Sequence, residues 1–186
     1  TDQLQPKNLG NAMVYGAEFE VRKDFSFFGE AWEDLSFNMN VSVIKSELEM
    51  SEEELEARRL SLRDGEKLET TRELQGQSPY LVNVGFSYGN DEGGWQAGLF
   101  YNMQGETLEV VGTGDVPDVY TMPFHSLNFN LTKSFGKEQN SSINFGIRNI
   151  LDDDLESKYQ SFKAQDQVFS RLSPGRGISL GYAYKF

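Results

Sequence analysis

The chain has 186 residues, with 17 Lys and Arg against 29 Asp and Glu and a formal net charge of −12. This acidic balance argues against nucleic acid as a partner, because phosphates require a basic surface. The absence of cysteine excludes disulfides and thiolate metal sites.

A chain can cross a membrane with α-helices or with β-strands. No apolar run approaches the roughly 18 residues that a transmembrane helix requires. Transmembrane β-strands need apolar residues at alternate positions only, so window averages miss them. The chain begins with Thr1 and no signal peptide is visible, so an exported protein would be represented here by a mature or partial chain.

Seven stretches alternate between apolar and polar residues with the period of a β-strand. In residues 13–23, Phe19 and Val21 lie on one face, and Glu18 and Glu20 lie on the other. The remaining stretches are residues 35–43, 80–88, 95–103, 127–135, 143–149 and 178–186.

The polar face of these stretches consists mainly of Asn, Ser, Gly, Gln and Glu, which is typical of the wet interior of a barrel. Aromatic residues gather at the ends of the stretches, as they do in the girdles of outer-membrane barrels. They are Tyr80, Tyr88, Trp95, Tyr101, Tyr184 and Phe186. We predict an all-β fold, namely an antiparallel transmembrane β-barrel segment; the alternative is an aromatic-rich soluble β-sandwich.

Short and long connections alternate along the chain. The short connections cover residues 24–34, 89–94 and 136–141, and the longer ones cover about 46–78, 104–120 and 163–175. Outer-membrane barrels have short periplasmic turns and longer extracellular loops. With the C-terminus in the periplasm, we expect Glu47 to Glu73 to lie outside the cell and Gly136 to Ser141 to face the periplasm.

The extracellular loop expected at residues 46–78 contains the pattern of a short helix. Ser51 and Glu54 have capping-box spacing, and Gly65 is a candidate stop. The many charges of this loop are expected to be solvated, with contact to a ligand as the alternative.

Catalytic and metal-binding patterns are weak. His125 is the only histidine, so a His-based triad or an imidazole cluster is not available. Residues 151–156, LDDDLE, lack the spacing of a calcium loop. Acid–base catalysis by Glu18 and Glu20 would require a cleft, and nothing in the sequence indicates one around them. We expect no enzyme, no cofactor and no metal site.

The C-terminus carries the first of several family resemblances. Ser179, Gly181, Tyr184 and Phe186 resemble the signal that bacterial outer-membrane proteins present to their barrel-assembly machinery. Residues 145–154, FGIRNILDDD, resemble the penultimate-strand motif of TonB-dependent receptors, with Ile150 as a mild departure. Further resemblances to the same family lie in SPGRGISLGYAYKF (173–186), VYGAEFEVRK (14–23) and LQGQSPYLVNVGFSY (74–88).

This resemblance to the C-terminal barrel region of TonB-dependent receptors implies that residues 1–186 supply about seven strands of a barrel of the 22-stranded type. The plug domain and the earlier strands would precede Thr1. The implied partners are the remaining barrel and plug, outer-membrane lipid, the barrel-assembly machinery, TonB acting through the plug, and a surface lipoprotein.

The implied function is active uptake of a nutrient across the bacterial outer membrane, with energy transmitted by TonB. Iron chelates, cobalamin, oligosaccharides and peptides are the substrate classes left open. The alternatives are a small self-contained barrel with a structural or adhesin role, and a soluble β-sandwich that acts as a binding module.

Overall fold

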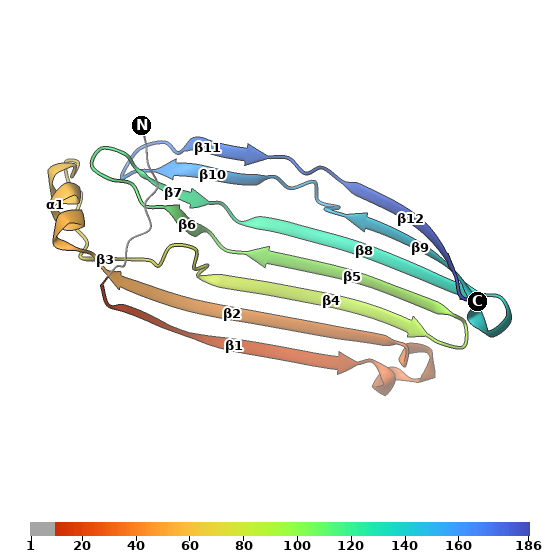
Figure 1. Cartoon of the computed structure of the whole chain (residues 1–186). Helices are drawn as coiled ribbons and strands as arrows, with labels where there is room; N and C mark the ends of the chain where they lie inside the picture. The colour runs from red at the N-terminus through yellow and green to blue at the C-terminus, as the bar shows by residue number, and fades with distance from the viewer. Residues whose placement is uncertain (1–9) are drawn as a thin grey trace.

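Seven long antiparallel strands form the main sheet of the computed structural model, which describes residues 10–186 (Figure 1). Along the sheet these strands follow the order of the chain, so each strand pairs with the next long strand. They are β1 (Ala12–Asp24), β2 (Leu35–Glu49), β4 (Tyr80–Asn90), β5 (Trp95–Gln104), β8 (Phe124–Phe135), β9 (Ser141–Arg148) and β12 (Gly177–Tyr184). In the described residues β1 and β12 are the two edges, and the sheet is open.

A smaller sheet continues the wall beyond the main one, in the order β11-β10-β7-β6. Its strands are β6 (Thr107–Val110), β7 (Asp118–Thr121), β10 (Leu155–Gln160) and β11 (Gln167–Leu172). Residues 104–120 and 163–175 were expected to be connections, and this was wrong for β6, β11 and most of β7. They form because Leu108 and Val119 become almost fully buried between them, with 0% and 2% of their surface exposed.

The remaining elements are short. Strand β3 (Thr71–Arg72) pairs with the end of β2, and helix α1 (Glu52–Leu60) lies in the connection between β2 and β4. Three 3₁₀ turns, Ser26–Phe28, Glu30–Trp32 and Lys137–Gln139, lie in the tight connections. Among residues 10–186 no helix is long and apolar enough to cross a membrane.

The register keeps like residues together across the main sheet. Val41 of β2 lies opposite Phe19 of β1 and Val82 of β4, whereas its neighbour Asn40 lies opposite Glu20 and Asn83. The alternation of single strands therefore becomes one apolar face and one polar face of the whole sheet. Cross-strand hydrogen bonds join side chains of the polar face in the pairs Asn40–Glu18, Asn102–Asn83 and Thr132–Asn144.

The apolar face of the main sheet is uncovered. Phe19, Ile178 and Leu180 expose 58%, 73% and 76% of their surface, and Figure 1 shows one curved layer of strands. A β-sandwich would bury this face against a second sheet. The sandwich alternative is therefore wrong for the described residues, because the smaller sheet extends the layer and does not cover it.

The two ends of the layer differ. The turns after β1, β4 and β8 gather at the end where the chain terminates, and α1 and the smaller sheet lie at the opposite end (Figure 1). The alternation of short and long connections predicted from the sequence corresponds to these two ends, which are called below the turn end and the loop end.

Glycines on the polar face make room for one large ring. The Phe100 side chain lies across two neighbouring glycines: a Cβ added at Gly98 would lie 2.5 Å from its Cε2, and one added at Gly85 would lie 2.9 Å from its Cδ1. Both contacts are shorter than van der Waals distance, so this aromatic can lie flat on the sheet only because both positions lack a side chain.

We predict that Gly98→Ala destabilises the full receptor by about 1–3 kcal/mol, since the new methyl group displaces the Phe100 ring. The measurement is the temperature at which the folded barrel loses its anomalous migration on SDS gels. Gly89→Ala is the matched control, because a Cβ there meets no atom within 4 Å. Equal losses in both variants would contradict the packing role of Gly98.

Candidate functional site

Helix α1 begins at a strong N-terminal cap. The Ser51 hydroxyl accepts a hydrogen bond from the Glu54 backbone N–H at 3.2 Å, and Glu52 and Glu53 complete an acidic first turn. Arg58 and Arg59 occupy the last turn, so the charges at both ends interact favourably with the helix dipole. The helix ends at Leu60, five residues before the Gly65 stop suggested by the sequence, because the Ser61 hydroxyl and backbone N–H bond to its last carbonyls.

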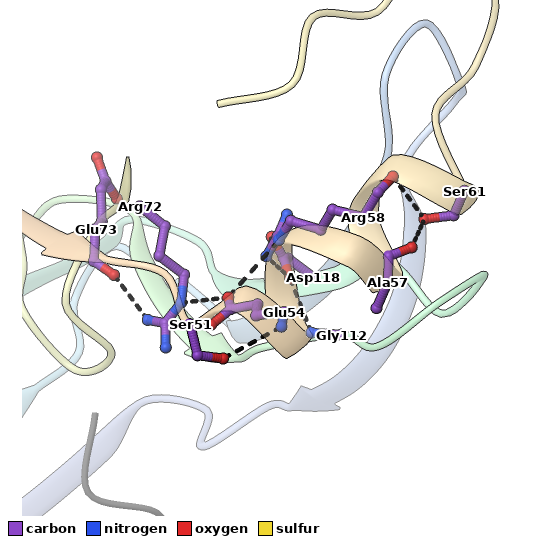
Figure 2. Close-up of polar contacts among 9 residues, drawn as sticks. All are labelled: Ser51, Glu54, Ala57, Arg58, Ser61, Arg72, Glu73, Gly112 and Asp118. Carbon is purple, nitrogen blue, oxygen red and sulfur yellow. Dashed lines mark hydrogen bonds and ion pairs between the residues drawn. The ribbon is translucent and has the colours of Figure 1, made fainter. Parts of the chain in front are cut away.

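Arg58 attaches this helix to the neighbouring loop (Figure 2). Its Nη2 donates to Oδ1 and Oδ2 of Asp118 at 3.1 and 3.0 Å. Oδ1 of Asp118 also accepts from the Gly112 N–H at 2.8 Å. The Asp118 carboxylate, at the start of β7, therefore bonds both to Gly112 in its own connection and to Arg58 of α1.

A second arginine approaches the same helix from β3. Arg72 Nε donates to Glu54 Oε1 at 2.8 Å, and the two side chains expose only 7% and 14% of their surface. Arg58 Nε lies 3.7 Å from the same Glu54 oxygen. The charges of the loop at residues 46–78 were expected to be solvated. This was wrong for Glu54 and Arg72, which pair in a largely buried network that Arg58 extends to Asp118 on β7.

Further bonds connect all three long connections at the loop end. Arg63 Nη1 donates to the Phe162 carbonyl at 3.1 Å, and the Gly76 N–H donates to the Leu108 carbonyl at 2.9 Å. Oε2 of Glu109 accepts from the Thr121 hydroxyl at 2.9 Å and from the Ser157 hydroxyl. We call this joined region of residues 50–79, 105–123 and 149–172 the loop cluster.

The loop cluster contains a hollow of about 290 Å³. Cationic and anionic groups line it together, including Arg63, Lys67, Glu69 and Asp115, with Phe162 as an aromatic wall. On β7 of the same cluster, burial raises the pKa of Tyr120 to about 12, and the nearby carboxylate of Asp118 acts in the same direction. Its phenol therefore stays protonated and can donate a hydrogen bond at any physiological pH.

A larger hollow, of about 950 Å³, lies over the polar face toward the turn end. Small and amide side chains line it, among them Gln96, Asn130, Thr132, Asn144 and Ser179. Such a surface can hydrogen-bond a polypeptide or water, and its charge is confined to Glu33 and Asp34.

The residues of the predicted assembly signal lie on and just after β12. Tyr184 and Phe186 stack edge-to-face with centroids 5.1 Å apart, and the Tyr184 hydroxyl accepts from Asn140 Nδ2 at 3.2 Å. Ser179 and Gly181 lie on the polar face, opposite Gly146 and Asn144. Their role in assembly stays a prediction.

The other residues considered for chemistry have structural partners. His125 Nδ1 lies 2.7 Å from the Tyr101 hydroxyl, and the backbone N–H of His125 donates to Asp153 Oδ2 at 2.7 Å. Glu18 pairs with Asn40, while Glu20 pairs with Arg22. Within residues 10–186 no group of three or more His, Cys, Asp or Glu is placed to hold a metal ion.

An open antiparallel sheet with an uncovered apolar face, an amide-rich opposite face, tight turns at one end and folded loops at the other defines a segment of an outer-membrane β-barrel. The sequence profile of the family described as TonB dependent receptor-like, beta-barrel matches residues 1–150. The chain belongs to this family.

Membership places the chain among the TonB-dependent transporters of the bacterial outer membrane, which are transporters and not enzymes. The family match ends at Ile150, so the C-terminal residues from Ser179 to Phe186 lie outside it. No curated protein matches the chain, and no solved structure does.

We predict that Arg58→Ala loosens the loop cluster, because it removes both bonds to Asp118 and leaves that carboxylate half-satisfied. Loss of such a charged pair costs about 1–3 kcal/mol, which corresponds to about 5- to 150-fold faster cleavage of residues 50–79 by an endoproteinase specific for glutamate. Neither this variant nor its control alters a cleavage site.

Arg59→Ala is the control, since Arg59 is 70% exposed and its nearest carboxylate, Glu56, lies 3.9 Å away. Its cleavage rate should match that of the unaltered receptor. Identical rates for all three proteins would show that Arg58 does not hold the loops.

Proposed function

We propose that this chain is the C-terminal part of a receptor that takes up an iron chelate, cobalamin, an oligosaccharide or a peptide. TonB transmits the energy of the inner-membrane proton gradient to a plug inside the barrel, and the loop cluster outside the cell makes the first contact with the nutrient. The C-terminus lies in the periplasm.

The observation that carries this proposal is the folded loop end. Residues 50–79 are joined to two other connections by Arg58 and Arg63, and Arg72 ties β3 to α1 within the same segment, so the sheet continues into an ordered structure past the membrane strands. A barrel that served only as a membrane anchor would not need such a structure. Ordered loops supported by a rigid sheet are where binding residues are commonly found.

The polar face of the main sheet supports the proposal of a plug inside the barrel. Its amides and glycines present a mostly uncharged surface over a hollow of about 950 Å³, with Glu33 and Asp34 as its charged residues. Such a wall suits a plug that must pack against the barrel and still move during transport. The barrel-assembly machinery is the further partner that we propose for Ser179, Gly181, Tyr184 and Phe186.

The transport proposal predicts that deleting the gene abolishes uptake of one substrate class in the native bacterium. Accumulation of radiolabelled ferric chelates, cobalamin, oligosaccharides and peptides is compared in the deletion strain and the complemented strain. Because the energy comes from the proton gradient, an uncoupler should stop the same uptake in the complemented strain. Unchanged uptake of all four classes would contradict the proposal.

The orientation is tested separately by cysteine labelling in a receptor that carries no other cysteine. Leu60 is 80% exposed at the end of α1, and Lys137 lies in the turn between β8 and β9. In intact cells a membrane-impermeant maleimide should react with Leu60→Cys and should react with Lys137→Cys only after the outer membrane is permeabilised. The opposite pattern would invert every strand.

A further inference from the structure

The hollow of the loop cluster lies between three connections that are distant in the sequence. Its lining comes from residues 50–69, 112–118 and 160–162. Figure 2 shows part of one wall, where Arg58 of α1 meets Asp118. Because bonds within the protein already hold this wall together, the hollow is formed before any ligand enters it.

Four of the charged side chains that line the hollow have structural partners. Arg58 and Asp118 form an ion pair at 3.0 Å. The Arg63 guanidinium donates to the Phe162 carbonyl, and the backbone N–H of Arg63 donates to Glu66 Oε2 at 2.9 Å. These groups build the walls, and a ligand that displaced them would have to break bonds of the fold.

The remaining three charged side chains of the lining are Lys67, Glu69 and Asp115. All three residues are exposed, and among residues 10–186 none of their side chains has a hydrogen bond or an ion pair. One cation and two carboxylates therefore line the same space unpaired. A ligand that carries groups of both signs can form charge-assisted hydrogen bonds with them and leave the fold intact.

Apolar side chains line the same hollow. Leu62 and Val116 expose 37% and 54% of their surface, and both lose contact with water when a ligand covers them. Phe162 adds an aromatic ring, but the Nζ of Lys163 lies 4.9 Å from its centre, so a cation already occupies one face of the ring.

These properties discriminate among the four substrate classes. A polyanionic ferric chelate would meet four carboxylates against three cations, and cobalamin is larger than a hollow of about 290 Å³. Oligosaccharides bind well on open aromatic faces, whereas in the described lining Phe162 is the one aromatic and Lys163 lies over it. A short peptide matches the whole lining, because its two termini carry opposite charges and its side chains can be apolar.

We propose that this hollow is a peptide subsite, in which Lys67 binds the C-terminal carboxylate of a short peptide and Glu69 and Asp115 bind its N-terminal ammonium. The proposal rests on the transport function proposed above and narrows its substrate to the peptide class. Because three connections line the subsite, a bound peptide bridges all of them.

The test measures binding of the tripeptide Ala-Leu-Ala to the purified full receptor by isothermal titration calorimetry. The same tripeptide is also titrated with an acetylated N-terminus or an amidated C-terminus, each of which removes one charge. We expect each modification to weaken binding about tenfold, through the loss of a charge-assisted hydrogen bond. Lys67→Gln should abolish the preference for the free carboxylate, and Glu69→Gln combined with Asp115→Asn should abolish the preference for the free ammonium.

Arg59→Gln and Glu56→Gln are the matched controls, because they remove charges of the same signs from α1 outside the hollow. Both should bind the free tripeptide as the unaltered receptor does. Retained anomalous migration on SDS gels shows that each variant is folded, as expected for substitutions of groups without partners.

No binding to the unaltered receptor, equal binding of free and modified tripeptides, or equal losses in the hollow variants and the controls would overturn the subsite. These measurements need neither TonB nor uptake. A receptor that takes up one of the other three classes and binds no peptide would overturn the subsite alone. Confirmed peptide binding without any change of uptake on gene deletion would contradict the transport proposal alone.

Discussion

A backbone in hydrocarbon can hydrogen-bond only to itself, and this constraint shapes the rest of the structure. Each long strand meets it by pairing with its neighbours, from β1 through β12, with an uninterrupted register over seven to thirteen residue pairs. The pairing fixes which side chains share a face, and so the lipid-facing and inward-facing surfaces follow from it. At β1 and β12 the described strands have one partner each, which requires further strands in a membrane.

Outside the hydrocarbon the constraint disappears, and the chain uses different means. At the loop end, short strands, a helix and ion pairs replace the long ladder, and buried apolar residues such as Leu108 and Val119 appear. At the turn end, the compact connections leave little to bury. The turn after β1 differs from the other two tight turns, because it carries the exposed aromatic side chains of Phe27, Phe28 and Trp32.

The long strands could be predicted from the sequence because a one-residue slip would exchange the two faces, so alternation is strictly imposed. Helix α1 could be located from Ser51 and Glu54 because capping is a local interaction. The ion-pair network could not be predicted, since Arg58 and Asp118 are 60 residues apart and meet only through the tertiary fold. The short strands could not be predicted for a different reason: segments of four to six residues carry too little alternation to separate them from loops.

The turn between β1 and β2 shows how a local pattern can be seen in the sequence and still be misread. FSFF and the following Trp32 are plain in the sequence, yet the region from Asp24 to Asp34 reads as a connection because it lacks alternation. In the structure Phe25 continues the apolar side of β1 and stacks on Phe27 and Phe28. Parity at Lys23 and Phe25, counted on from β1, is the signal that could have indicated it.

The joined loops bear on how such a receptor can be re-engineered. Asp118 lies on one connection and its partner Arg58 on another, while Arg63 reaches a third at Phe162. Transplanting one loop from a relative would leave a charged group without its counterpart inside the new protein. The modular unit for exchange is therefore the three loops together, grafted at the ends of the long strands, where the regular ladder gives every relative the same points of attachment.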